Sequence, residues 1–419
     1  MTDAALAPSN ASVNRALGAM VAGSAIWVGV FLSGFVLHEP APYELYMAGL
    51  IGAWALTGLL TIPRSVIFPL TLLLVFNIGG VIAVTQLAEW GDAPLYMASS
   101  LFLALSAVFF ASVIAADSRR LSLVFNAWTI AALLTGGAAI IGYFDLVPGT
   151  QQFTLYGRAK GLFEDPNVFA PYLLMPTLFA IHGVLTRPAR QMIPSAAIAV
   201  VLSIALFLSF SRAGWGLLAM GSMLLVVALF LNSSSSRFRL RILILSIFAI
   251  AGIVAALIVV LQIDAVRALF LERAQLLQDY DAGHMGRFER HLMGYMQATE
   301  TPLGIGPGQF ARIYGEDPHN IWLKSLFAYS WLGFAAYVTL VIVTLAGGFR
   351  ILFRDRPWQP YLLCAYIAFF GHVAIGNVID TDHWRHFYLL LGIVWGCIAL
   401  EAKHMRAVEP TARPLAQLV

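Results

Sequence analysis

Long apolar segments alternate with short polar ones along the whole chain. Most apolar segments run for about 20 residues, the length that crosses the hydrocarbon core of a bilayer as an α-helix. Lipid offers no partner to an unpaired backbone amide, so each span must be helical. The pattern predicts an all-α, polytopic helical membrane protein with about twelve transmembrane helices, forming one integral membrane domain over residues 1–419. The predicted spans cover residues 15–37, 43–62, 66–87, 94–116, 121–143, 167–186, 192–210, 213–231, 239–261, 320–348, 359–378 and 384–401.

Composition supports this interpretation and excludes several other classes. Hydrophobic residues make up 60% of the 419 residues and charged residues only 11%, with a mean hydropathy of +0.80. Soluble domains carry about 25% charged residues, so a water-soluble, disordered or collagen-like chain is excluded. The net charge of +3 is too small to indicate a nucleic-acid partner; membrane lipids are the expected surroundings. Cys364 and Cys397 both lie in apolar segments, which argues against a disulfide framework or a zinc site.

Basic residues set the orientation of the spans, because Lys and Arg accumulate in cytoplasmic loops. With the N-terminus placed in the cytoplasm, more than half of the 25 basic residues fall in cytoplasmic segments. Both termini are then cytoplasmic, including a tail over residues 402–419. The outer face carries a loop at 144–166 and a longer one at 263–318, within which residues 266–277 have the spacing of an amphipathic helix. Loops of this length are usually functional or disordered, so we expect any chemistry on the outer face.

Cationic side chains are concentrated in three outer motifs. Arg212 lies in a short turn between two spans, where its guanidinium suits either contact with lipid phosphates or recognition of a pyrophosphate. Arg287 and Arg290 lie in the longer loop, and that motif by itself is more typical of a solvated charge run. Arg158 and Lys160 precede two carboxylates, so they can bind a phosphate or pair with those neighbours.

A histidine and an aspartate in two further outer motifs suit acid–base chemistry. Pro318 predicts a helix start close to His319 and Asn320. Neutral imidazole can accept a proton near pH 7, although an interfacial histidine bonded to loop backbone is an equal alternative. Asp380 can orient His319 or hold an acceptor hydroxyl, unless it lies in a solvated turn. A metal site within residues 380–383 is conceivable, but its spacing is not diagnostic, and we predict no metal and no cofactor.

Taken in order, these motifs resemble the O-antigen ligase and O-antigen polymerase superfamily. The resemblance covers residues of about 150–400, and the residues before it match only as apolar spans. The residues that carry it are Arg158 to Asn167 with Ala170, Ser211-Arg212, Gly286-Arg287, Gly304-x-Gly306-x-Gly308-x-Phe310 and Pro318-His319-Asn320.

The resemblance implies a metal-independent transfer of a glycan from an undecaprenyl-diphosphate carrier to an acceptor, at the periplasmic face of the bacterial inner membrane. It implies that Arg212 and Arg287 bind the diphosphate and that His319 acts as the base on the acceptor hydroxyl. A late aspartate of the family corresponds to Asp380. The further candidate substrate-binding residues are Arg158, Lys160, Asn320 and Arg290.

Within this superfamily we favour a ligase, which uses lipid A–core as the acceptor, and we weigh three alternative functions against it. An O-antigen polymerase would use the same chemistry on a carrier-linked acceptor; we prefer the ligase because one long outer loop directly precedes the Pro-His-Asn motif. A transporter would fit the number of spans, but transporters place ionisable residues near the bilayer midplane, whereas here they cluster at one face. A scaffold without chemistry would not need the base.

Overall fold

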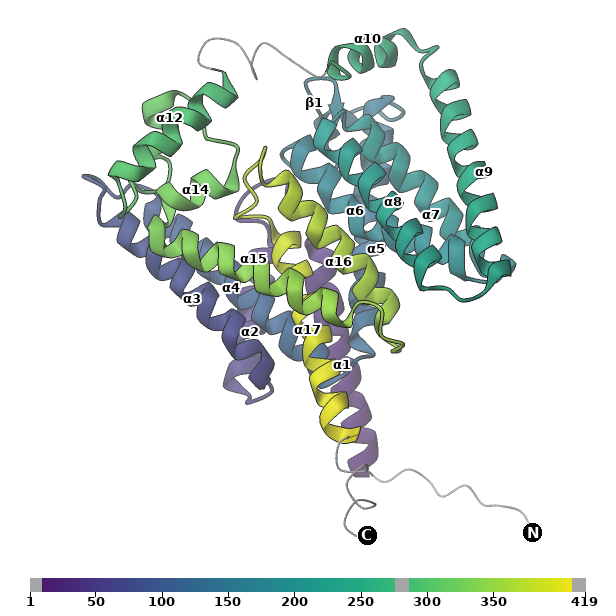
Figure 1. The fold of residues 1–419 in the computed structure, drawn as a ribbon, viewed down its shortest axis with the longest axis horizontal. Helices are drawn as coiled ribbons and strands as arrows, with labels where there is room; N and C mark the ends of the chain where they lie inside the picture. Colours follow the sequence, from purple (N-terminus) through teal and green to yellow (C-terminus); the bar gives the residue numbers. More distant parts are fainter. Residues whose placement is uncertain (1–9, 276–285, 409–419) are drawn as a thin grey trace.

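The apolar segments fold as helices in the computed structural model, which describes residues 10–275 and 286–408 (Figure 1). In this part of the chain, nine helices are long and apolar enough to cross a membrane, and residues Ala16–Leu32 and Gln359–Ile375 form shorter apolar helices. The protein is therefore an all-α, multi-pass membrane protein. The helices that correspond to the predicted spans are α1 (Asn10–Leu32), α2 (Pro42–Leu56), α3 (Arg64–Val84), α4 (Ala93–Ala116), α5 (Arg120–Tyr143), α6 (Pro166–Thr186), α7 (Ala189–Leu208), α8 (Arg212–Asn232), α9 (Ser236–Val260), α15 (Ser330–Ile351), α16 (Gln359–Ile375) and α17 (Arg385–Val408).

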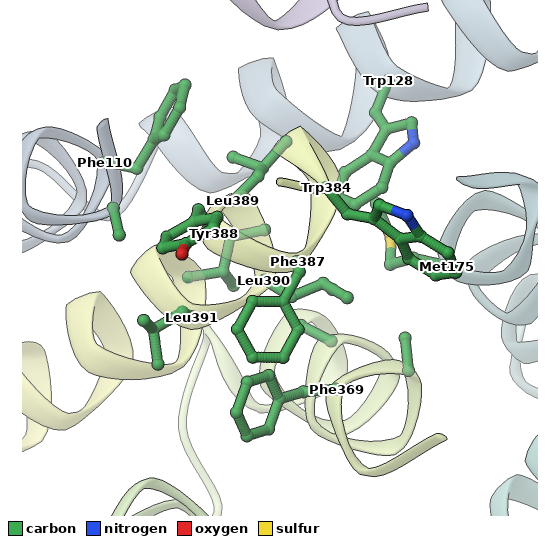
Figure 2. Close-up of a cluster of buried hydrophobic side chains, with 14 of the residues drawn as sticks. Phe110, Trp128, Met175, Phe369, Trp384, Phe387, Tyr388, Leu389, Leu390 and Leu391 are labelled. Atoms are coloured by element: carbon green, nitrogen blue, oxygen red, sulfur yellow. The ribbon is translucent and has the colours of Figure 1, made fainter. Parts of the chain in front are cut away.

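Helix α17 forms the centre of the molecule. It packs along α4 and also contacts α3, α15 and α16. Figure 2 shows residues 387–391 of α17 surrounded by side chains of α4, α5, α6 and α16. In contrast, α9 lies at the edge of the bundle with almost its whole surface exposed (Figure 1). Such a helix is stable in a bilayer because lipid tails are as apolar as its side chains.

The loops predicted on the outer side contain short elements at one end of the molecule (Figure 1). Residues 144–166 include η1 (Thr150–Phe153) and a hairpin of β1 (Thr154–Leu155) and β2 (Arg158–Ala159). Tyr156 and Gly157 both have positive φ, as tight hairpin turns require. The longer loop contains α10 (Asp264–Arg273), α12 (Arg287–Glu300) and α13 (Gln309–Tyr314), followed by α14 (Ile321–Ala328).

The prediction of one continuous span over residues 320–348 is wrong, because α14 ends at Ala328 and α15 begins at Ser330. Ser330 has a φ of +60°, which breaks the helical path. The carbonyl of Phe327 accepts hydrogen bonds from the backbone amides of residues 305–306, at 3.0 and 3.1 Å. The preceding loop thus satisfies a backbone group at the break, and α14 lies across the end of α15 (Figure 1).

Several predicted boundaries also shift: the span predicted at 15–37 ends at Leu32 in α1, and the span predicted at 43–62 ends at Leu56 in α2. Two further boundaries lie next to residues outside the described part. The amphipathic segment 266–277 forms α10, which ends at Arg273, and residues 276–277 lie outside the described part. Helix α17 continues to Val408, seven residues into the tail predicted at 402–419; residues 409–419 lie outside the described part. The sequence signal for this end was weak because Glu401 and the basic residues after it resemble a polar tail.

Candidate active site at the start of α14

Asn320 fixes the start of α14. Its side-chain oxygen accepts a hydrogen bond from the amide of Leu323 at 3.0 Å, as an N-cap residue does. Its side-chain amide donates to the carbonyl of Asn377 at 3.1 Å, and its backbone amide donates to Oδ1 of Asp380 at 2.9 Å. These bonds join the start of α14 to the loop between α16 and α17. They give Asn320, predicted as a substrate-binding residue, a structural role beside His319.

His319 lies between two carboxylates. Its Nε2 is 3.2 Å from Oε1 of Glu316, and its Nδ1 is 3.9 Å from Oδ2 of Asp380. The side chain is 35% exposed, so it remains accessible to a ligand. His319 has a φ of +47°, in a region that non-glycine residues seldom adopt and that is enriched at functional sites. An imidazole held in this way can take a proton while an adjacent carboxylate stabilises the resulting cation.

Lys324 occupies the space between three carboxylates. Its ammonium lies 3.5 Å from Asp380, 3.7 Å from Asp382 and 3.9 Å from Asp317, and its side chain is only 15% exposed. Burial raises the pKa of Asp380, and the charge of Lys324 offsets this only in part. Lys324 is not among the residues predicted for the site; its signal in the sequence is a single lysine at the otherwise apolar start of a predicted span.

Asp382 is the more strongly held of the two aspartates in this loop. It is 2% exposed, and its Oδ2 accepts hydrogen bonds from the hydroxyls of Tyr96 and Tyr329. Burial alone would raise the pKa of Asp382, but the charges of Lys324 and His383 outweigh it and lower the pKa. Asp382 is therefore a stable negative charge that anchors Lys324.

The sequence made a metal site at residues 380–383 conceivable, although none was predicted. Within the described ranges, no group of three His, Cys, Asp or Glu side chains is arranged to hold a metal ion. The two aspartates of this segment converge on the ammonium of Lys324 instead.

Helix α12 supports the residues that precede His319. Arg290 lies 2.5 Å from Oε2 of Glu316, and Nε2 of His291 is 2.5 Å from the carbonyl oxygen of Pro318. Burial lowers the pKa of His291, so its neutral ring can donate to that carbonyl. Burial would raise the pKa of Glu316, but its hydrogen bond and ion pair with Arg290 lower it. Arg290, predicted to bind substrate, thus forms an ion pair that holds Glu316 in place.

The two arginines predicted to bind a diphosphate begin two different helices at this end of the molecule (Figure 1). Arg287 is the first residue of α12, one turn before His291. Burial and, to a lesser extent, the positive charge of Arg287 lower the pKa of His291. Arg212 is the first residue of α8, and its guanidinium donates to the carbonyl of Gln275 beyond α10, at 3.4 Å. Segment 276–285, which links the two neighbourhoods, lies outside the described residues. Convergence of Arg212 with Arg287 and His319 stays a prediction.

Arg158 ties the β-hairpin to the helices beneath it. Its Nε donates to the carbonyl of Ser209 at 2.8 Å, and its Nη2 donates to Oδ1 of Asn167 at 2.7 Å. Asn167 lies in the first turn of α6, as the helix-start interpretation of its motif predicted. Lys160 follows β2 with a half-buried side chain, and its backbone amide donates to the carbonyl of Phe153 at 2.9 Å.

Two pockets flank the cluster around Lys324. One, with a volume of about 220 Å³, is lined by Tyr96, Asp317 and Lys324 together with the start of α13. The other, of about 160 Å³, is lined by His383 and Arg385 together with the loop before α6. Carboxylates, cations and imidazoles of this kind suit a ligand rich in hydroxyl groups. No protein-family model matches the chain, and a search of curated proteins found no match.

Proposed function

We propose that the protein is a metal-independent O-antigen ligase. It moves O-antigen polysaccharide from undecaprenyl diphosphate to a sugar hydroxyl of lipid A–core, in the periplasmic leaflet of the bacterial inner membrane. The proposal includes twelve spans, cytoplasmic termini and a periplasmic site at α12 and α14. The observation that carries it is His319, whose partly exposed ring lies between Glu316 and Asp380 just before α14. The ordered motifs that resemble the superfamily support it.

The reaction requires a base and positive charge on the leaving group. His319 removes the proton of the acceptor hydroxyl as its oxygen attacks the anomeric carbon, a contribution of about 10²–10⁴ in rate. The bond from that carbon to the diphosphate breaks, and undecaprenyl diphosphate leaves. Arg212 and Arg287 bind the departing diphosphate, where one electrostatic donor contributes about 10²–10³. Attack opposite the diphosphate inverts the anomeric centre.

The proposal is tested by transfer in vitro from a defined undecaprenyl-diphosphate glycan to purified lipid A–core. His319→Ala is expected to lower the rate by at least about 100-fold, whereas the control His404→Ala, at the far end of α17, leaves it unchanged. Wild-type activity with a chelator present is expected to equal that without it. Unchanged transfer by His319→Ala would exclude the proposed base.

The acceptor distinguishes the ligase from the polymerase. Offered both lipid A–core and a second carrier-linked repeat unit, the purified protein is expected to use lipid A–core. Elongation of the carrier-linked glycan instead would identify a polymerase. Transfer between two lipids in detergent, where no gradient exists, would exclude a transporter.

A further inference from the structure

A separate pocket lies at the end of the molecule opposite α14. Its volume is about 320 Å³, and it is an open pocket lined by the start of α3, the end of α4 and the last turns of α17. In Figure 1 this region is near the C-terminal end of α17, away from α12 and α14. Its lining residues are Thr61, Ile62, Pro63, Arg64, Ser65, Ser112, Ala115, Ala116, Ala399, Ala402, Lys403 and Arg406.

Positive charge dominates this pocket. Arg64, Lys403 and Arg406 line it, and no lining residue is acidic. The nearby carboxylate of Glu401 is engaged elsewhere, 2.7 Å from Arg354 and 2.9 Å from Arg356. Helix α3 begins at the pocket with no side-chain cap on its first turn, and a helix N-terminus adds positive potential and unpaired amides. The arrangement favours an anion.

A buried hydroxyl in the same pocket independently indicates a missing partner. Ser112 of α4 is 3% exposed, and its Oγ has no hydrogen-bond partner among the described residues. Ser106, which is fully buried on the same helix, instead donates to the carbonyl of Leu103 at 2.7 Å. An unpaired buried hydroxyl costs free energy, and a bound anion would supply an acceptor.

We infer that this pocket is a phosphate-binding site, formed by Arg64, Lys403, Arg406, the first turn of α3 and the hydroxyl of Ser112. It is separate from His319 and does not depend on the proposed transfer reaction. The phosphate can belong to the headgroup of an anionic phospholipid or to a free phosphate ion. Anionic lipids are concentrated at the cytoplasmic surface, the side on which the basic residues predict this end to lie.

The inference is tested on the purified full-length chain in neutral detergent. The thermal unfolding midpoint is followed while short-chain phosphatidylglycerol, phosphatidylcholine of equal chain length or inorganic phosphate is added, because a ligand of the folded state raises the midpoint. Wild type is expected to be stabilised by phosphatidylglycerol and not by phosphatidylcholine. Equal stabilisation by inorganic phosphate identifies a free ion as occupant; stabilisation by phosphatidylglycerol alone identifies a headgroup.

Variants then locate the binding. The double variant K403Q/R406Q is expected to bind at least about tenfold more weakly, and Ser112→Ala severalfold more weakly without altering the packing. The matched control Arg350→Gln removes an exposed cation from the end of α15 and is expected to bind as wild type does. Equal binding by the double variant and wild type would overturn the inference. An equal loss of binding in Arg350→Gln would overturn it as well, and so would the absence of stabilisation by both phosphatidylglycerol and inorganic phosphate.

Discussion

Lys324 is the residue that draws the acidic side chains of two separate loops together. Asp317 precedes α14, whereas Asp380 and Asp382 lie between α16 and α17. One ammonium among three carboxylates leaves an excess of negative charge beside His319. The acidic side chains therefore lie beside the ring that is proposed to act as the general base.

The two aspartates are expected to respond differently to replacement by asparagine. Asp380→Asn keeps an acceptor for the amide of Asn320 but removes the charge beside His319, so transfer falls on the order of tenfold or more and stability at neutral pH is kept. Asp382→Asn removes the ionised anchor of Lys324, so the fold loses roughly 2 kcal/mol. Transfer rates and thermal unfolding midpoints of both variants check this; loss of stability in Asp380→Asn alone would contradict it.

The pH dependence of stability follows from the lowered pKa of Asp382. A carboxyl whose pKa is lower in the folded state stabilises the fold above its ordinary pKa, about 3.9, and this contribution is lost as the pH falls through the folded value. The raised pKa of Asp380 acts in the opposite sense, since it favours folding at low pH and the contribution is lost as the pH rises through the folded value. Wild type is therefore expected to lose stability below about pH 4 more steeply than Asp382→Asn. Parallel acid-unfolding curves would contradict this.

At the scale of elements, the break between α14 and α15 positions the site. Because α14 is a separate helix of eight residues, its first turn can be fixed by Asn320 and the loop before α17. The sequence predicted the helix start correctly from Pro318. It did not predict the break, because most residues across it are apolar. The features found there are the positive φ of Ser330 and the backbone contact of Phe327 with residues 305–306.

Asn320→Ala is expected to lower both stability and transfer. It removes the N-cap bond, worth about 1 kcal/mol, and the bond to the carbonyl of Asn377, worth about 1 kcal/mol. Asn320→Asp keeps the cap and should recover part of the stability. The control is Asn232→Ala at the exposed end of α8. Thermal unfolding midpoints measure the effect, and equal midpoints for Asn320→Ala and the control would refute it.

At the scale of the whole molecule, the expected orientation places α12 and α14 in the periplasm. Cys364 and Cys397 are buried, so the wild-type background of thiol labelling should be low. A membrane-impermeant thiol reagent applied to spheroplasts is expected to label Glu300→Cys at the end of α12 and not Ser234→Cys between α8 and α9. Both positions are exposed. Labelling of Ser234→Cys alone would reverse the topology.

The sequence by itself determined the fold class and the places where polar chemistry concentrates. Hydrophobic length specifies a membrane helix almost without context, since lipid forces each span to satisfy its own backbone. Local signals placed α6 and α14 at Pro166 and just after Pro318. The role of an individual side chain was less predictable: Arg158, Arg290 and Asn320, all predicted as substrate-binding residues, bond to other parts of the protein.

Only the tertiary structure decided which polar groups meet. Lys324, Asp382 and Tyr96 come from distant parts of the chain and converge on one buried cluster. Their pairing depends on how α4, α14 and the loop before α17 come together, which no local periodicity encodes. The same holds for the basic pocket around Ser112, where α3, α4 and α17 meet. Burying a polar or charged group costs free energy unless it is paired, and the fold determines which partners lie within reach.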